Sequence, residues 1–300
     1  MTRTWTGSNG GVDWELSLDR DDLLPGRLVG GVLRATARKA VEARAVIVTL
    51  RGVEHWRYEV TTSNGETTTT TIHTGREDLP AVPVRLAGPV ALAAGETREL
   101  PFELPGPPLG PPTVLAENAG VDWTVEVKLD REGGFDAGIE VPVRVHQPVA
   151  LLRAGVVRVG EFALYGSAEG DDGGDLGGTA ELDPVPLAAG QPFSGRVSLR
   201  TASPVSVRSI RGELKVRVEA TVGGGLKETL TAWSSTIAGP MALADGQAFE
   251  LAGVLDAAVP PTVDLRHGRV SARFELILDR PLRPDLRLGR DVAVATTLEL

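Results

Sequence analysis

The alternation of apolar and polar residues along most of the chain constrains the fold more than any other feature. Val46, Val48 and Leu50 share one face of an extended segment, while Ile47 and Thr49 lie on the other. The same period of two recurs in residues 123–130, 141–145 and 213–219. Because antiparallel strands with one buried and one solvated face show this pattern, the sequence predicts an all-β fold.

Composition favours short strands joined by turns. The 300 residues include 36 glycines and 21 prolines; glycine supplies positive φ in turns, and proline is excluded from central strands. Aromatic residues make up only 4% of the chain, so valine, leucine, isoleucine and alanine must build the core. This length is typical of two domains, and each half is long enough to bury its own core.

Two local segments carry specific expectations. Asn64-Gly65 is a strong two-residue turn signal, so we predict a hairpin there, with the threonines 67–71 in its second strand. Residues 166–178 are rich in glycine and aspartate, and Leu176 is their only apolar anchor. We therefore expect an exposed, mobile loop from Gly166 to Gly178.

Charge and cysteine content exclude several classes of function. The net charge is −9 and no cluster of lysine and arginine offsets it, so nucleic acid is not an expected partner. The chain has no cysteine, which excludes disulfides, thiolate metal sites and cysteine catalysis. It shows neither a secretory signal nor a run of ~20 apolar residues that could span a membrane, so we expect a cytoplasmic protein.

No catalytic motif is present. The four histidines are scattered, and none has the spacing of a metal site: His55, His73, His146 and His267. The chain has no Gly-x-Ser-x-Gly elbow, and the glycines at 30–31 and 223–225 lack the lysine and helix of a phosphate cradle. We therefore predict no catalytic residue, no cofactor and no enzymatic activity. A distant pair of carboxylates for glycoside hydrolysis stays open.

One acidic loop is a candidate for a metal site. Asp171, Asp172 and Asp175 offer oxygen ligands of the kind that calcium prefers. They lack the spacing and the terminal glutamate of an EF-hand, so a solvated loop is the favoured interpretation. No metal site is predicted.

The two halves of the chain share landmarks in the same order. A glycine turn, a second glycine five residues on and a strand begin at Gly26 and again at Gly190. Each is followed by a further strand that ends in Arg-Gly, at residues 51–52 and 211–212. Such self-similarity is the usual mark of an internal repeat.

A second set of landmarks is more specific. Residues 90–96 resemble residues 241–247, and both continue into Glu-Leu. Pro-Pro-Thr-Val then follows at 111–114 and 260–263, and an alternating strand closes each half on Asp-Arg. We therefore predict two tandem copies of one antiparallel β-sandwich, residues 8–147 and 148–300.

These landmarks resemble those of the arrestin-like family over nearly the whole chain. The matching parts are Pro25-Gly26 before Gly31-Val32-Leu33, Gly52 close to Trp56, and Leu100-Pro101-Phe102-Glu103-Leu104-Pro105 before Gly120-Val121-Asp122-Trp123. Thr113 stands where the family usually has serine, and Trp123 where it has tyrosine. In the second half, Ala-Gly-Val-Leu at 252–255 replaces Pro-Phe-x-Leu.

The resemblance implies two arrestin-like, immunoglobulin-like β-sandwich domains, and it is closest to the bacterial sporulation-control type. Proteins of that type are regarded as non-catalytic cytoplasmic regulators or adaptors. The chain shows neither the buried charged cluster of phosphate-sensing animal arrestins nor their clathrin-binding tail. The resemblance therefore does not extend to receptor-style phosphate sensing.

The preferred hypothesis is a cytoplasmic adaptor or scaffold that binds other proteins through edge strands and loops, linked by the resemblance to sporulation or stress control. The alternative is a module that binds carbohydrate or another small molecule, which predicts solvent-facing aromatic residues on one sheet. An enzyme is the third hypothesis and requires a deep pocket of convergent polar groups. We expect Trp123 to be buried and Trp5 to be the most mobile tryptophan; the binding residues stay unassigned.

Overall fold

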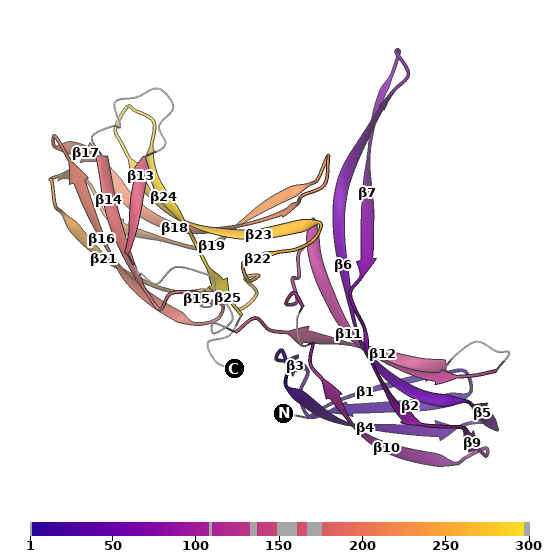
Figure 1. Cartoon of the computed structure of the whole chain (residues 1–300). Helices are drawn as coiled ribbons and strands as arrows, with labels where there is room; N and C mark the ends of the chain where they lie inside the picture. Colours follow the sequence, from indigo (N-terminus) through magenta and orange to yellow (C-terminus); the bar gives the residue numbers. More distant parts are fainter. Residues whose placement is uncertain (1, 108–109, 133–136, 149–160, 167–175, 297–300) are drawn as a thin grey trace. The chain divides into compact units, whose positions relative to one another are not determined.

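The computed structural model describes residues 2–107, 110–132, 137–148, 161–166 and 176–296. Within these ranges the chain is built of β-strands (Figure 1), which confirms the predicted all-β class. Among the described residues, no helix is long and apolar enough to cross a membrane. The chain divides into two compact units. Unit 1 is Met1–His55, Thr74–Val114 and Gly120–His146, and unit 2 is Trp56–His73, Leu115–Ala119 and Gln147–Leu300.

Two sheets form unit 1. The first has the strand order β1 (Arg3–Asn9), β2 (Val12–Leu18), β4 (Leu28–Ala37) and β10 (Thr97–Pro105), all antiparallel. The second has the order β3 (Asp22–Leu23), β12 (Ala137–Val145), β11 (Ala119–Asp130), β6 (Ala45–Ser63) and β7 (Thr68–Asp78), and β8 (Val82–Ala87) also pairs with β6. The short strands β5 (Val41–Ala43) and β9 (Val90–Leu92) pair with each other in a separate two-stranded sheet. The parts of β6 and β7 between Trp56 and His73 belong to unit 2.

The core of unit 1 follows the predicted alternation. Val46, Val48 and Leu50 are buried on β6, and Ile47 and Thr49 are only partly covered. On the other sheet the inward residues are likewise large and apolar, among them Leu16, Leu33 and Leu104. Each sheet therefore buries one apolar face, as in a β-sandwich.

One curved sheet dominates unit 2. Its strand order is β19 (Lys227–Ala238), β18 (Ser209–Ala220), β23 (Gly268–Asp279), β24 (Leu286–Val292), β13 (Glu161–Gly166), β14 (Leu176–Asp183), β16 (Pro192–Thr201) and β21 (Ala248–Val254), and β22 (Val263–Asp264) pairs with β23. Two short pairs complete the unit: β15 (Leu187–Ala188) with β25 (Val294–Ala295), and β17 (Val205–Val207) with β20 (Met241–Leu243). The sheet forms a half-barrel (Figure 1), which brings its first strand, β19, close to its last, β21.

Aromatic side chains close the seam between β19 and β21. Trp233 of β19 packs edge-on against Phe193, with ring centroids 5.2 Å apart, and stacks on Phe274 at 6.4 Å. A Cβ at Gly253 of β21 would collide with the indole of Trp233. The seam is therefore filled by side chains, and no backbone ladder joins these two strands.

The hairpin predicted at Asn64-Gly65 is confirmed. It joins β6 to β7, Gly65 has a φ of +90°, and Asn64 N–H donates to Thr67 O at 3.3 Å. The threonine run lies largely in β7, which begins at Thr68.

The predicted loop from Gly166 to Gly178 is wrong at both of its ends. Gly166 ends β13, and Leu176 to Gly178 begin β14. Leu176 is buried and pairs with Thr201, so one apolar anchor is enough to start the strand. A Cβ at Gly178 would lie 2.7 Å from Ser198 O, so this glycine permits a close approach of β16. Residues 167–175, with the acidic candidate Asp171–Asp175, lie outside the described residues.

The Pro-Pro-Thr-Val landmarks make the same contact in both units. Thr113 Oγ1 accepts a hydrogen bond from Val145 N–H at 2.8 Å, and Thr113 N–H donates to Val145 O. In unit 2, Thr262 Oγ1 accepts from Val294 N–H at 3.1 Å, and Thr262 N–H donates to Val294 O. In each unit the threonine thus satisfies a backbone donor at the end of a strand.

The Asp-Arg landmarks also correspond. Arg44 N–H donates to Asp130 O and the two side chains pair at 2.5 Å; Arg208 and Asp279 repeat both contacts, with the same 2.5 Å separation. The Arg-Gly landmarks at 51–52 and 211–212 do not occupy equivalent positions in the two units. The number of residues between Arg44 and Arg51 differs from the number between Arg208 and Arg211.

We predict that Thr113→Val destabilises unit 1 by about 1–3 kcal/mol, because it leaves the N–H of Val145 buried without an acceptor. Urea unfolding followed by circular dichroism measures the effect. Thr97→Val is the matched control, since the Thr97 hydroxyl pairs with Thr36 on an exposed surface. Equal stability of the two variants would contradict the assigned role.

Candidate functional site

The outer face of the first sheet of unit 1 carries a dense set of polar side chains. Its strands bury Val12, Trp14 and Leu16, so the residues between them point outward. These outward residues are Thr4, Thr6 and Ser8 on β1, Asp13, Glu15 and Ser17 on β2, and Arg34 and Thr36 on β4. Alternation within each strand and the register between strands together place hydroxyls, carboxylates and a guanidinium on one surface.

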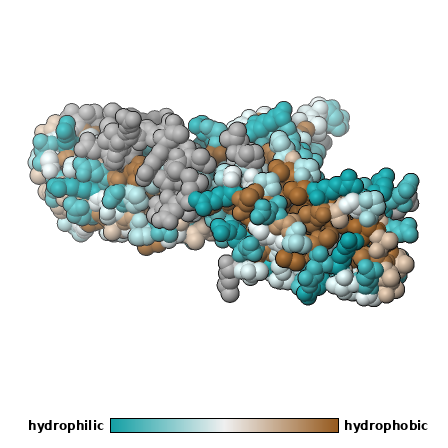
Figure 2. Space-filling model, turned by 60° about the horizontal axis from the view of Figure 1, so that its bottom comes forward, coloured by the Kyte–Doolittle hydropathy of each residue, from teal (hydrophilic) through white to brown (hydrophobic). Residues whose placement is uncertain are grey.

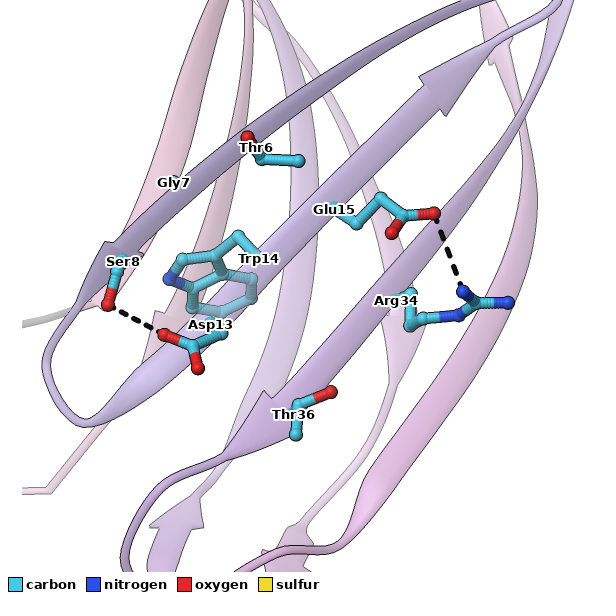
Figure 3. Close-up of a pocket in the computed structure, with 8 residues that line it drawn as sticks. All are labelled: Thr6, Gly7, Ser8, Asp13, Trp14, Glu15, Arg34 and Thr36. Atoms are coloured by element: carbon cyan, nitrogen blue, oxygen red, sulfur yellow. Dashed lines mark hydrogen bonds and ion pairs between the residues drawn. The ribbon is translucent and has the colours of Figure 1, made fainter.

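A pocket of about 480 Å³ lies on this face (Figure 3). It is lined by Thr6, Gly7, Ser8, Asp13, Trp14, Glu15, Arg34 and Thr36. Hydrogen bonds between neighbouring strands fix several of the side chains. Ser8 Oγ donates to Asp13 Oδ1 at 2.7 Å, and the hydroxyls of Thr36 and Thr97 are 2.9 Å apart.

Arg34 is the charged centre of the pocket. Its Nε and Nη2 donate to Glu99 Oε1 at 2.8 and 2.5 Å, and its Nη1 lies 3.6 Å from Glu15 Oε1. The hydrogen bond to Glu99, followed by the charges of Glu99 and Glu15, raises the pKa of Arg34 above its ordinary value. The guanidinium is thus held in place by two carboxylates on flanking strands.

Trp14 lines the pocket but offers no accessible aromatic surface. It is 2% exposed, and its Nε1 donates to Asn9 Oδ1 at 3.0 Å. Asn9 also exchanges hydrogen bonds with the backbone of Gly138, which fastens β1 to β12. Stacking of a ligand on this indole is therefore blocked by its burial.

Unit 2 has a pocket of about 530 Å³ on the outer face of β14, β16 and β21. Its lining consists of Glu181, Leu182, Asp183, Ser194, Gly195, Arg196 and Glu250. Arg196 and Glu250 lie opposite each other across β16 and β21, with 3.8 Å between Nε and Oε1. An exposed arginine–glutamate pair thus joins the last two strands in the sheet order of both units, β4 with β10 and β16 with β21.

A further polar group, which we call the ionic cluster, lies on β18 and β23 of unit 2. It consists of Arg211, Glu213, Lys215, Arg273 and Glu275. Glu213 and Glu275 are directly opposite each other in the ladder, an arrangement that like charges disfavour. Lys215 Nζ lies 3.1 Å from Glu213 and 2.9 Å from Glu275, so it bridges the two carboxylates.

The ionic cluster shifts two pKa values. Burial alone would raise the pKa of Glu213, but hydrogen bonds from Lys215 and Arg211 hold this pKa below its ordinary value. Burial would lower the pKa of Lys215, but hydrogen bonds to Glu275 and Glu213 keep it above its ordinary value. Both shifts favour the charged forms of Glu213 and Lys215.

The four histidines make separate contacts. His55 lies 3.3 Å from Asp122, His146 lies 2.7 Å from Asp22, His73 stacks on Tyr58, and His267 stacks on Trp56 with ring centroids 3.7 Å apart. Within the part of the chain that the structure describes, no three histidine, aspartate or glutamate side chains are grouped as a metal site would require.

The tryptophan predicted to be buried is buried. Trp123 is 3% exposed, and its Nε1 donates to Pro111 O at 3.1 Å. Trp5 is half-buried on β1, with the guanidinium carbon of Arg3 5.2 Å from the ring centroid. The remaining large apolar side chains that reach solvent include Leu115, Leu230, Val254 and Leu282. Figure 2 shows hydrophobic patches between hydrophilic residues on the face turned forward.

Sequence reasoning assigned a binding role to none of the residues that line the two pockets. The alternation of Thr4, Thr6 and Ser8 was available as a signal for a polar sheet face. It could not identify the neighbours across β1, β2 and β4, because cross-strand pairing depends on register. Chemically, each pocket offers an arginine that is already paired with a carboxylate, Arg34 with Glu99 and Arg196 with Glu250.

Comparisons with known proteins were made for the whole chain. A scan against models of protein families finds none that matches, and a search of curated proteins finds no match either.

Lys215→Met tests the ionic cluster through its pH dependence. Because the folded-state pKa of Glu213 is lowered, this carboxylate adds stability above its unfolded pKa of about 4.3, and the stability is lost as the pH falls through the folded pKa. We expect the substitution to cost about 1–3 kcal/mol near pH 7 and much less at an acidic pH that protonates Glu213 in the folded chain. Urea unfolding at the two pH values measures the difference.

Arg217→Met is the control for this prediction, since Arg217 pairs with Glu219 outside the cluster. We expect it to have little effect at either pH. A loss of stability in the Lys215 variant that is the same at both pH values would show that packing, and not charge, explains it.

Proposed function

We propose that the chain is a tandem pair of arrestin-like β-sandwich domains, residues 8–147 and 148–300, derived from one another by duplication. Equivalent contacts at the paired landmarks support this: Thr113 with Thr262, and Arg44–Asp130 with Arg208–Asp279. The turns at Gly95 and Gly246 add to the support, because both glycines have positive φ. In each turn the next side chain accepts a backbone hydrogen bond: Glu96 from Ala93 N–H, and Gln247 from Ala244 N–H.

The proposed function is that of a non-catalytic cytoplasmic adaptor that binds other proteins through edge strands and loops. The resemblance to the sporulation-control type suggests a role in sporulation or stress control. One observation carries the binding proposal: β19 is the first strand of its sheet, and its residues 229–232, which precede the seam residue Trp233, include no charged residue and no proline and, among the described strands, have no ladder partner on their outer side. Such an edge is a template for an added strand.

Other edge strands carry the protections that natural sheets use against pairing. β10 contains Pro101 and Pro105, and β8 contains Pro83 and Arg85. Proline removes a backbone donor, and a charge on an edge disfavours a dry ladder. β19 lacks these protections in the stretch before Trp233, where Leu230 is 44% exposed.

Leu230→Lys tests the adaptor function. A lysine at this position places a charge on the edge of β19, so we expect protein partners captured by the tagged wild-type chain from its native cells to be lost. Quantitative mass spectrometry of the captured proteins measures the loss. Leu282→Lys is the matched control, because Leu282 is fully exposed in the turn between β23 and β24.

The captured proteins of the two variants and of the wild-type chain decide whether the adaptor function holds. Partners kept by the Leu282 variant and lost by the Leu230 variant support binding at β19. A folded wild-type chain that retains no reproducible partner would overturn the adaptor function.

The polar pocket of unit 1 favours a second candidate function, a module that binds a carbohydrate or another small polar molecule. Its hydroxyls, carboxylates and Arg34 suit such a ligand, although the aromatic platform expected of a carbohydrate site is buried. If this function holds, Arg34→Ala is expected to weaken binding of a hit from a glycan array at least about tenfold by calorimetry. Arg200→Ala, on an exposed part of β16, is the control.

A further inference from the structure

The hairpin of residues 56–76, which we call the arm, joins the end of β6 to β7 (Figure 1). All residues from 59 to 74 are exposed. The hydroxyls of Thr61 and Thr70 lie 3.1 Å apart across the two strands, and Tyr58 stacks on His73. The arm therefore presents the outer edge of β7 to solvent.

The backbone of β7 has unused hydrogen-bonding groups along this edge. Asn64 N–H donates to Thr67 O, and Leu79 N–H donates to Gly52 O, so odd-numbered residues at both ends of the second strand bond to β6. In an antiparallel ladder, residues that bond to one neighbour alternate with residues that point to the other side. The even-numbered residues from Thr68 to Arg76 therefore direct their N–H and C=O groups outward. Among the described residues no strand pairs with that side of β7.

The centre of β7 also lacks protection against pairing. Residues 67–75 include no charged residue and no proline. Threonine favours extended backbone, and threonine hydroxyls pair with one another across strands, as Thr61 and Thr70 already do. The edge is thus suited to another threonine-rich strand.

Charges at the two ends of this stretch define the register. Glu66 lies at the turn, Arg76 lies near the end of β7, and both are exposed. When two β7 strands run antiparallel about Thr71, Glu66 of each copy lies opposite Arg76 of the other. A shift of two residues in either direction removes both ion pairs, so charge complementarity selects this one register.

We propose that β7 binds β7 of a second copy of this chain, antiparallel about Thr71, in a two-fold symmetric dimer. The residues that point outward are the ones that would bond, and Thr71 lies on the axis as a non-hydrogen-bonded pair. The interface is small, so the association is weak and reversible. This proposal is independent of partner binding at β19.

Charge reversal tests the register. Arg76→Glu sets carboxylates against each other at both ends of the pair, and Glu66→Arg does the same with guanidinium groups. Each is expected to weaken the dimer at least about tenfold in sedimentation equilibrium, and the double variant E66R/R76E is expected to restore it. Arg200→Glu makes the same charge change on β16, away from the arm, and is expected to leave the dimer unchanged.

A single cysteine tests the axis, because the chain has none of its own. Opposed residues of a non-hydrogen-bonded pair have Cα atoms about 4.5 Å apart, within the range of a disulfide. Thr71→Cys is therefore expected to give a covalent dimer on mild oxidation. Thr69→Cys is the matched control, since in this register the two copies of residue 69 are about 13 Å apart.

The results that support the dimer differ from those that contradict it. A covalent dimer with the cysteine at 71 and not at 69, together with rescue by the double charge reversal, supports the proposal. Equal cross-linking at both positions, a double variant as weak as the single ones, or a wild-type chain that stays monomeric up to about 1 mM would overturn it.

Discussion

The small number of aromatic side chains determines how the sheets of this chain pack. With aromatics at 4% of residues, most of the space between layers is filled by valine, leucine and alanine, and a large ring fits only where a neighbouring strand leaves room. In unit 1 a Cβ at Gly52 would lie 3.0 Å from the indole of Trp123. In unit 2 a Cβ at Gly212 would lie 2.8 Å from the indole of Trp233. Glycines beside the rings are therefore a packing requirement in both units.

The outer faces depend on this packing, because the same alternation that fills the core sends polar residues outward. Across neighbouring strands these residues pair with opposite charges, as Arg34 does with Glu99 and Lys215 with Glu275. A surface whose charges are already paired is ordered and offers few groups for proton transfer. Such a surface suits recognition, and this is why binding, by edge or by pocket, is the function that we propose.

Much of the fold could be predicted from local patterns. The alternation located the buried faces of β6 and β11, Asn64-Gly65 located a hairpin, and Trp123 is buried as expected. The start of β14 at Leu176 was missed, because its glycines resemble a loop until β13 and β16 are placed on either side. The pockets were missed for a related reason. Their residues come from strands whose register no single segment of sequence determines.

The seam between β19 and β21 has a mechanical consequence. The other neighbouring strands described in the curved sheet of unit 2 are joined by backbone ladders, the shortest of them with two residue pairs, as between β13 and β24. Between β19 and β21 the ladder is replaced by the side chain of Trp233, which lies against Gly253 and packs on Phe193 and Phe274. Unit 2 thus has a built-in line of opening, along which its interior becomes wet before any strand leaves its neighbour.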